Sequence, residues 1–188
     1  MSKQDLQLLA NIKKSHLLVI DVQTRLAQVM SERKSLLRNC EILIKAARLL
    51  DVPITVTEQY PKGIGPTEPE LVNALENSVA PVEKTCFSCC GSDDFNAVIK
   101  QHKKTQMVLC GIEAHVCVLQ TTMDLLQSGK QVYVAADAID SRNKDNKKLA
   151  LDRMQQAGAI ITCTESIVFE WLQDAKHEQF KNISALIR

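Results

Sequence analysis

Three side chains with acid–base or nucleophilic chemistry stand where apolar runs of this sequence end. Asp21 closes LLVID, Lys84 lies in PVEKTCFS, and Cys117 lies in CGIEAHVCV, just where helical spacing begins. The opening turn of a helix favours an anion, because its backbone N–H groups are unpaired. A nearby lysine favours a thiolate further, and an aspartate can accept a proton and return it. Together the three residues would form an activated nucleophile with its own general base.

Each of these residues also has a plainer interpretation. An aspartate at the end of a strand is more often a helix cap or a turn former. A lysine after a strand is more often a solvated loop residue. The alternative to a shared site is therefore three unrelated surface and core residues.

The elements that would position these residues follow from the apolar pattern. Short, largely apolar runs are typical of strands buried on both faces. They span His16–Asp21, Pro53–Thr57, Val79–Val82, Gln106–Gly111, Gln131–Ala136 and Ala159–Cys163. Apolar residues three and four apart predict helices between most of them. The clearest examples are Leu36, Cys40, Leu43, Ala47 and Leu50, and then Val118, Thr122 and Leu125 with Gly129 as a stop.

Strands that alternate with helices predict an α/β fold, a three-layer α-β-α sandwich around a mostly parallel six-stranded sheet. Its functional site should lie at the carboxyl ends of the strands. We expect the first strand near the centre, beside both the third- and the fourth-strand neighbourhoods. The three candidate residues could then converge.

The bulk composition is that of one globular domain over residues 1–188, with a helical tail from about residue 166. The default role of that tail is packing, possibly against another subunit. The chain has 23 basic and 22 acidic residues and no block of five like charges. Nucleic acid and membrane surfaces are therefore not expected partners, whereas a small polar substrate is.

The N-terminus and the cysteines bear on the compartment. The first apolar run begins only at Leu17, without the order of features that marks a signal peptide, so we expect a cytoplasmic protein. Seven cysteines are an odd number, and the single C-x-x-C, Cys86 to Cys89, has no second pair to complete a zinc site. Most are expected to be buried, reduced thiols. No metal site and no cofactor are predicted.

A loop rich in proline and glycine, Glu58 to Pro69, is expected to be irregular and to roof a site at this edge of the sheet. Five residues are candidates for the lining of a substrate pocket: Gln23, Glu58, Tyr60, Phe87 and His115. For most of them, loop capping or core packing is an equally good interpretation.

In this order and at these separations, LLVIDVQ, the lysine of EKTCFS, and CGIEAHVCV resemble the isochorismatase-like cysteine hydrolases, which include nicotinamidases and N-carbamoylsarcosine amidases. The resemblance runs from about Leu17 to about Glu165. The segments TEQYPKGIGPTEPEL and VAADAIDSR are closest to the isochorismatase domain-containing subgroup. The motifs are specific for the family and weak for the substrate.

The resemblance implies a role for each candidate residue. Cys117 would attack a carbonyl carbon, Asp21 would be the general base and acid, and Lys84 would stabilise the thiolate. It also implies a cis peptide bond between Ile112 and Glu113. The backbone N–H groups of Glu113 and Cys117 would form an oxyanion hole. Gly111 suits the tight exit from the strand, and Cys110 is expected to be a core thiol.

Two features depart from nicotinamidases. Glu113 stands where they usually carry a small residue. Their Asp-x-His metal pair is missing, since no histidine lies between His16 and His102. We therefore expect hydrolysis of a small amide or related acyl compound without a metal, by a homodimer or a larger homo-oligomer. Two other functions remain open: a binding or scaffold protein with a vestigial triad, and nucleic-acid cleavage, which the near-zero net charge disfavours.

Overall fold

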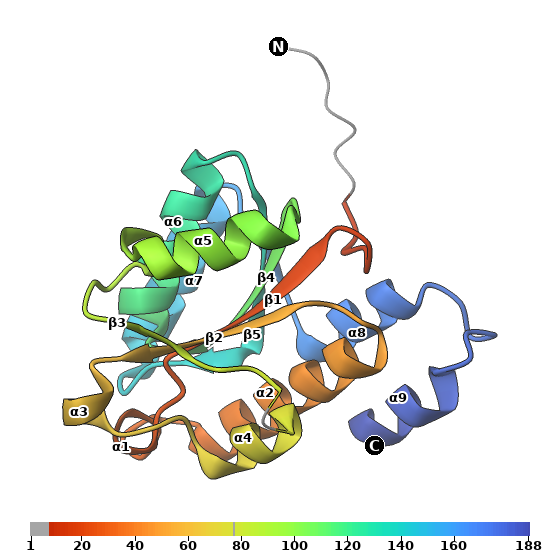
Figure 1. The fold of residues 1–188 in the computed structure, drawn as a ribbon, viewed down its shortest axis with the longest axis horizontal. Coiled ribbons are helices and arrows are strands. Elements are labelled where there is room, and N and C mark those ends of the chain that lie inside the picture. Colours follow the sequence, from red (N-terminus) through yellow and green to blue (C-terminus); the bar gives the residue numbers. More distant parts are fainter. Residues whose placement is uncertain (1–7, 77) are drawn as a thin grey trace.

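The computed structural model describes residues 8–76 and 78–188. Its centre is a six-stranded sheet in the order β3-β2-β1-β4-β5-β6, with every neighbouring pair parallel (Figure 1). The strands are β1 (Ser15–Ile20), β2 (Ile54–Gln59), β3 (Val82–Lys84), β4 (Gln106–Ile112), β5 (Gln131–Asp140) and β6 (Ile160–Thr162). The predicted parallel α/β fold is confirmed.

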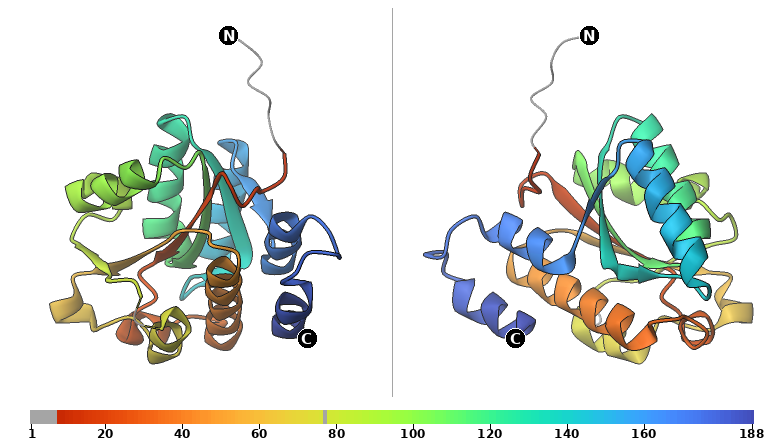
Figure 2. Two further views of the ribbon diagram at one scale, coloured as in Figure 1. Left: turned by 45° about the vertical axis from the view of Figure 1, so that its right-hand side comes forward. Right: turned by 180° about the vertical axis from the view of Figure 1, so that it is seen from behind.

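Helices cover both faces of this sheet (Figures 1 and 2). One face carries α2 (Arg33–Leu49), α4 (Pro69–Leu75), α8 (Thr164–Leu172) and α9 (Phe180–Ile187). The other face carries α5 (Asp93–His102), α6 (Leu119–Gln127) and α7 (Lys144–Gln156). Shorter helical segments lie in the connections: α1 (Thr24–Ala27), α3 (Pro61–Ile64), η1 (Cys89–Gly91) and η2 (Ala114–Val118).

The side chains of β1 show why the strand is apolar throughout. Leu17 and Val19 pack into the core under α2, whereas Leu18 and Ile20 pack into the core under α5 to α7. Successive strand residues point to opposite faces, so a strand covered on both sides needs apolar residues at every position.

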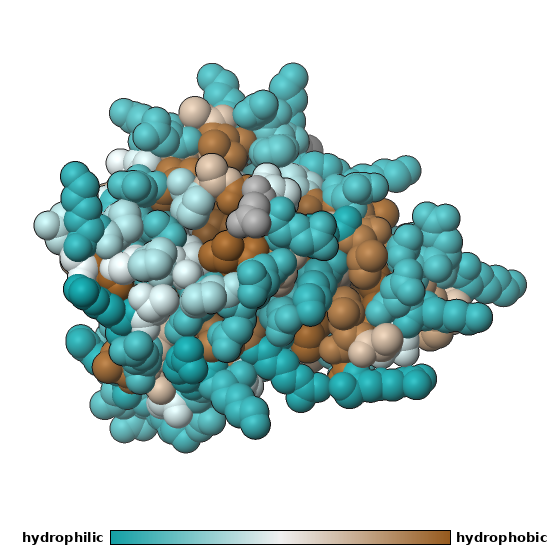
Figure 3. Space-filling model, turned by 60° about the horizontal axis from the view of Figure 1, so that its bottom comes forward, coloured by the Kyte–Doolittle hydropathy of each residue, from teal (hydrophilic) through white to brown (hydrophobic). Residues whose placement is uncertain are grey.

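The C-terminal segment folds back onto the chain as two helices, α8 and α9. Trp171 is buried, and its indole N–H donates to Ser15 Oγ at 2.9 Å, which joins α8 to the start of β1. Figure 3 views the molecule from the side of α2, α4 and α9; polar side chains cover most of this face, and apolar residues show between them.

Two predicted boundaries were wrong. The strand expected at Val79–Val82 begins only at Val82, because Pro81 has no N–H to donate to the ladder with β2. Lys84 therefore ends β3 instead of following it. The expected loop at Glu58–Pro69 is not wholly irregular either: its start belongs to β2, and α3 opens on Pro61, which has the backbone φ of a first helical residue.

No helix within the described ranges is long and apolar enough to cross a membrane. The first seven residues, on which the signal-peptide argument partly rests, lie outside the described part of the chain.

His16 is buried uncharged near the start of β1. Its Nε2 shares a 2.8 Å hydrogen bond with Thr55 Oγ1, and its Nδ1 has no partner among the described residues. Burial, followed by the charges of His102, Lys104 and Lys130, lowers the pKa of His16 to about 3. The unfolded chain therefore binds a proton near its ordinary pKa of about 6.5, well before the folded chain does.

We predict that His16 makes the fold acid-sensitive. Its stabilising contribution is complete above about pH 6.5 and is lost as the pH falls toward about 3. Between pH 7 and 5 the free energy of unfolding should fall by about 2 kcal/mol from this residue alone. Urea unfolding of wild type and His16→Gln at both values measures it; an equal fall in the two proteins would contradict the prediction.

Candidate active site

The sheet order places the carboxyl ends of β1, β2 and β3 side by side, with β2 in the middle. The expectation that the third strand neighbours the first was therefore wrong. Adjacent strands lie about 4.8 Å apart, so a residue on β3 must reach about 10 Å to meet one on β1. The long side chain of Lys84 spans that distance across β2.

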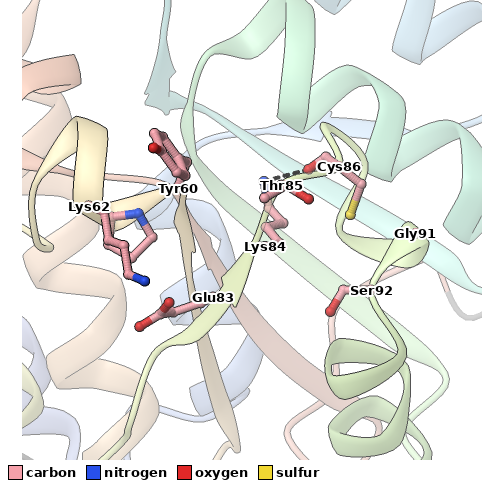
Figure 4. Close-up of a pocket in the computed structure, with 9 residues that line it drawn as sticks. Tyr60, Lys62, Glu83, Lys84, Thr85, Cys86, Gly91 and Ser92 are labelled. Carbon is pink, nitrogen blue, oxygen red and sulfur yellow. Dashed lines mark hydrogen bonds between the residues drawn. The ribbon is translucent and has the colours of Figure 1, made fainter.

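A buried ion pair joins the two strand ends. Lys84 Nζ donates to Asp21 Oδ2 at 2.6 Å, and both side chains are fully buried. The ammonium also donates to Gln59 Oε1 at 2.7 Å and meets the carbonyl oxygens of Cys86 and Phe87 at 3.3 Å; Figure 4 draws the bond to Cys86. Its three N–H donors are thus fully used. Burial, the largest single effect, would lower the pKa of Lys84. The charge of Asp21, the neighbouring Cys89 and Cys117 groups and the hydrogen bond to Asp21 together outweigh it and raise the pKa.

Asp21 leaves β1 in a left-handed backbone conformation with φ 52°. Aspartate tolerates this conformation better than most residues. Its Oδ1 accepts a hydrogen bond from Thr57 Oγ1 at 2.7 Å, and its backbone N–H donates to the carbonyl of Thr57. The carboxylate is therefore fixed on one side by Thr57 and on the other by Lys84.

Sequence reasoning missed Thr57 and Gln59, both on β2. A signal for them existed: in TVTEQ, polar residues recur at every second position of a buried strand, at Thr55, Thr57 and Gln59. Polar side chains that share one face of a buried strand must find partners there. At the carboxyl end of β2, the partner of Thr57 is Asp21 and the partner of Gln59 is Lys84.

Cys117 lies in η2, a π-helical segment that leads into α6, and it is 6% exposed. Burial raises the pKa of its thiol well above the ordinary value. The Asp21 carboxylate adds to that rise, and Lys84 opposes it. The expectation of a resting thiolate was therefore wrong, because burial and the Asp21 carboxylate together outweigh the favourable charge of Lys84. The resting thiol keeps its proton and lies beside a carboxylate that can take it.

The turn before Cys117 is held by backbone geometry. The Ile112–Glu113 peptide bond is cis, as the resemblance implied, and Gly111 has φ 122°. A Cβ atom at Gly111 would lie 2.1 Å from the carbonyl oxygen of Ile20 on β1, so only glycine fits there. Cys110 is a buried core thiol whose Sγ lies 3.6 Å from the carbonyl oxygen of Leu18.

Glu113 and His115 tie this segment to the loop after β5. The Glu113 carboxylate accepts a hydrogen bond from the backbone N–H of Arg142 at 3.1 Å and lies 3.7 Å from Arg142 Nε. His115 Nδ1 shares a 2.9 Å hydrogen bond with Ser141 Oγ. These two side chains thus anchor the residues that precede Cys117.

Besides His115, two more of the candidate pocket residues are occupied by structural bonds. Gln23 donates to the carbonyls of Gln59 and Gly65 and accepts from the backbone N–H of Gln59. Glu58 accepts two 2.7 Å hydrogen bonds from Thr67. Both side chains hold the segment after β2 in place, and their contact with a substrate stays a prediction.

A cavity of about 460 Å³ lies beside the ion pair, at the end of β3 (Figure 4). It is lined by Tyr60, Pro61, Lys62, Glu83, Lys84, Thr85, Cys86, Gly91 and Ser92. Tyr60 lines this cavity, and its part in a substrate pocket stays a prediction. Asp21, Cys117 and Phe87 are not among its lining residues, and the ring of Phe87 is 55% exposed. The described residues contain no group of three or more His, Cys, Asp or Glu side chains that could hold a metal ion.

This α/β architecture, with an aspartate, a lysine and a cysteine gathered at the carboxyl ends of its strands, is typical of a hydrolase fold. Residues 15–166 match the family model described as the isochorismatase domain. The chain belongs to the isochorismatase family.

Several relatives are close in sequence or structure. Isochorismatase family protein 1A of Dictyostelium discoideum is 41% identical over 92% of this chain and 85% of its own length. The human isochorismatase domain-containing protein 2 is 43% identical over 78% of this chain and 69% of its own length. A Caenorhabditis elegans structure described as MAR1 ribonuclease is 40% identical, with a TM-score of 0.90 over 95% of this chain and 92% of that one.

We predict that removing one partner of the buried ion pair destabilises the protein more than removing both. Lys84→Met leaves the Asp21 carboxylate buried without its cation and should cost about 3–5 kcal/mol of unfolding free energy. Adding Asp21→Asn to that variant removes the stranded charge and should recover most of the loss. Urea unfolding measures all three proteins; equal stability of the single and double variants would contradict a charge-pair origin.

Proposed function

We propose that this chain is a cysteine hydrolase that cleaves a small amide or a related acyl compound through a thioester on Cys117. The observation that carries the proposal is the buried Asp21–Lys84 pair, 2.6 Å from Nζ to Oδ2. The Cys117 thiol lies beside it, and burial and the Asp21 carboxylate raise the pKa of that thiol. A base, a cation and a nucleophile thus share one water-poor site.

The first half of the reaction forms the thioester. As Cys117 Sγ bonds to the substrate carbonyl carbon, Asp21 takes the thiol proton. The carbonyl oxygen becomes an oxyanion, which the backbone N–H groups of Glu113 and Cys117 would stabilise. The C–N bond then breaks, and Asp21 returns its proton to the departing nitrogen, which leaves as amine or ammonia.

The second half regenerates the enzyme. A water molecule gives a proton to Asp21 and attacks the thioester carbonyl carbon. The C–S bond breaks, the carboxylic acid leaves, and Cys117 recovers its proton from Asp21. Lys84 stays charged throughout, so each negative charge that develops beside it is stabilised. The scheme requires only the chain, the substrate and water.

The burial of the site supports a small substrate. Asp21 and the Lys84 side chain are fully buried, and Cys117 is 6% exposed. Cys117 therefore offers little exposed surface to an approaching molecule. An extended polymer would need to insert one group deeply, whereas a small amide can enter whole.

RNA cleavage is the second candidate, because the 40% identical C. elegans structure carries the name ribonuclease. The near balance of 23 basic and 22 acidic residues provides little attraction for a phosphate backbone. A scaffold role without turnover is the third. Self-association, which the resemblance implied, stays a prediction; an Escherichia coli structure described as an octameric hydrolase is 23% identical and shares the fold.

The test is a panel of small primary amides, carbamoyl compounds and single-stranded RNA, incubated with wild type, Cys117→Ala and Asp21→Asn. We expect release of ammonia or amine from at least one small compound by wild type. Both variants should lose about 100-fold or more, the contribution typical of a nucleophile or general base. Intact-mass measurement should show an acyl adduct that is lost with Cys117.

Other outcomes separate the alternatives. RNA cleavage that survives in Cys117→Ala would support the second candidate and contradict the thioester route. Folded wild-type protein with no turnover and no acyl adduct across the panel would favour the scaffold role.

A further inference from the structure

A second buried thiol stands beside the proposed catalytic group without a part in the chemistry above. Cys89 opens η1 and has no exposed surface. Its Sγ lies 3.8 Å from Thr57 Oγ1, within reach of an S–H donor. Its backbone N–H donates to Thr121 Oγ1 at 2.9 Å, which connects it to α6. The thiol is therefore held against Thr57.

The hydrogen bonds from Cys89 to Asp21 can run in only one direction. An ionised carboxylate only accepts, so Thr57 must donate its single hydroxyl proton to Asp21 Oδ1, at 2.7 Å. Thr57 Oγ1 is then free only to accept, and its partner is the S–H of Cys89. Burial and the charge of Asp21 raise the pKa of Cys89 to about 12, so this thiol keeps the required proton.

The hydrogen bonds from Cys89 through Thr57 reach one of the two oxygens of the Asp21 carboxylate. Lys84 holds Oδ2 at 2.6 Å, and Thr57 holds Oδ1. A hydroxyl can rotate about its C–O bond. The Thr57 hydroxyl therefore points its proton toward Asp21 Oδ1 most reliably when another donor occupies a lone pair of Thr57 Oγ1. Cys89 is placed to supply that donor.

We propose that Cys89 is a positioning residue for Asp21: its S–H orients the Thr57 hydroxyl toward Oδ1, which fixes the carboxylate between Lys84 and Cys117. The inference rests on the proposed function, in which Asp21 exchanges a proton with Cys117. Without the Cys89 donor, the Thr57 proton can turn away and Asp21 carries its charge with less stabilisation. The Asp21 charge, no longer offset by the Thr57 hydroxyl, then repels a thiolate at Cys117 more strongly and raises the pKa of Cys117.

The experiment compares Cys89→Ala with Cys89→Ser, whose side chains are nearly equal in size but differ in the hydroxyl donor. Thr57→Val removes the link itself. The readout is the rate at which iodoacetamide alkylates Cys117 at pH 8.5, followed by peptide mass, with thermal unfolding as the check of folding. This rate follows the thiolate fraction and requires no substrate.

We expect Cys89→Ala and Thr57→Val each to slow the alkylation of Cys117 about 3- to 10-fold, a rise in its pKa of roughly half to one unit. The double variant should be no slower than Thr57→Val alone, because Cys89 acts through Thr57. Cys89→Ser should stay within about twofold of wild type. Should Cys89→Ala fail to fold, Cys89→Val fills the space without a donor and carries the same expectation.

Three results would overturn the inference: an unchanged rate in Cys89→Ala, equal slowing by Cys89→Ala and Cys89→Ser, or single-variant effects that multiply in the double variant. The two proposals fail separately. If wild type hydrolyses no amide and the alkylation pattern holds, the proposed function fails and the positioning role stands. If amides are hydrolysed and the alkylation pattern is absent, the proposed function stands and the positioning role fails.

Discussion

The buried ion pair between Asp21 and Lys84 is the constraint on which the rest of this site depends. Two charges removed from water are tolerated only where each finds its partner and further hydrogen bonds. The fold meets that requirement with residues of β2, which lies between the two strands: Thr57 donates to the carboxylate and Gln59 accepts from the ammonium. The carbonyls that follow β3 complete the shell around Lys84. The sheet order and the length of a lysine side chain together make this arrangement possible.

The pair also contributes, together with burial, to the resting state of Cys117. Burial is the largest cause of the raised pKa of this thiol, the Asp21 carboxylate raises the pKa further, and the charge of Lys84 opposes both without overcoming them. The proposed chemistry therefore begins with proton transfer to Asp21 as the substrate is attacked, and no preformed anion is needed. In the proposed mechanism, this arrangement leaves the Cys117 thiol protonated until a substrate carbonyl group is attacked. It also gives Asp21 a constant role, since every proton that moves passes through it.

The sequence predicted the family, the parallel sheet and the convergence of Asp21, Lys84 and Cys117 at one edge, because apolar runs and strand ends depend on local pattern. It placed β3 wrongly, since an edge strand of three residues has little pattern of its own and Pro81 delays its ladder. Side-chain partners were harder to predict. Gln23 and Glu58 hold the segment after β2 in place through hydrogen bonds, and Cys89 packs against Thr57. The contacts of Gln23 and Cys89 join segments that are distant in the sequence. The resting thiol was missed because the effect of Lys84 was considered without the burial of Cys117 and the charge of Asp21.

The central claim is that burial and the Asp21 carboxylate, against the opposing charge of Lys84, keep Cys117 protonated at rest. The most direct measurement is the titration of its ¹³Cβ resonance. Cysteine-labelled protein would be followed from pH 6 to about 9, near the ordinary pKa of a thiol, with the signal assigned by its loss in Cys117→Ser. The account predicts no titration of this resonance in wild type and a lower pKa in Asp21→Asn, where the cation is no longer neutralised. A thiolate at pH 7 in wild type, or a higher pKa in Asp21→Asn, would contradict it.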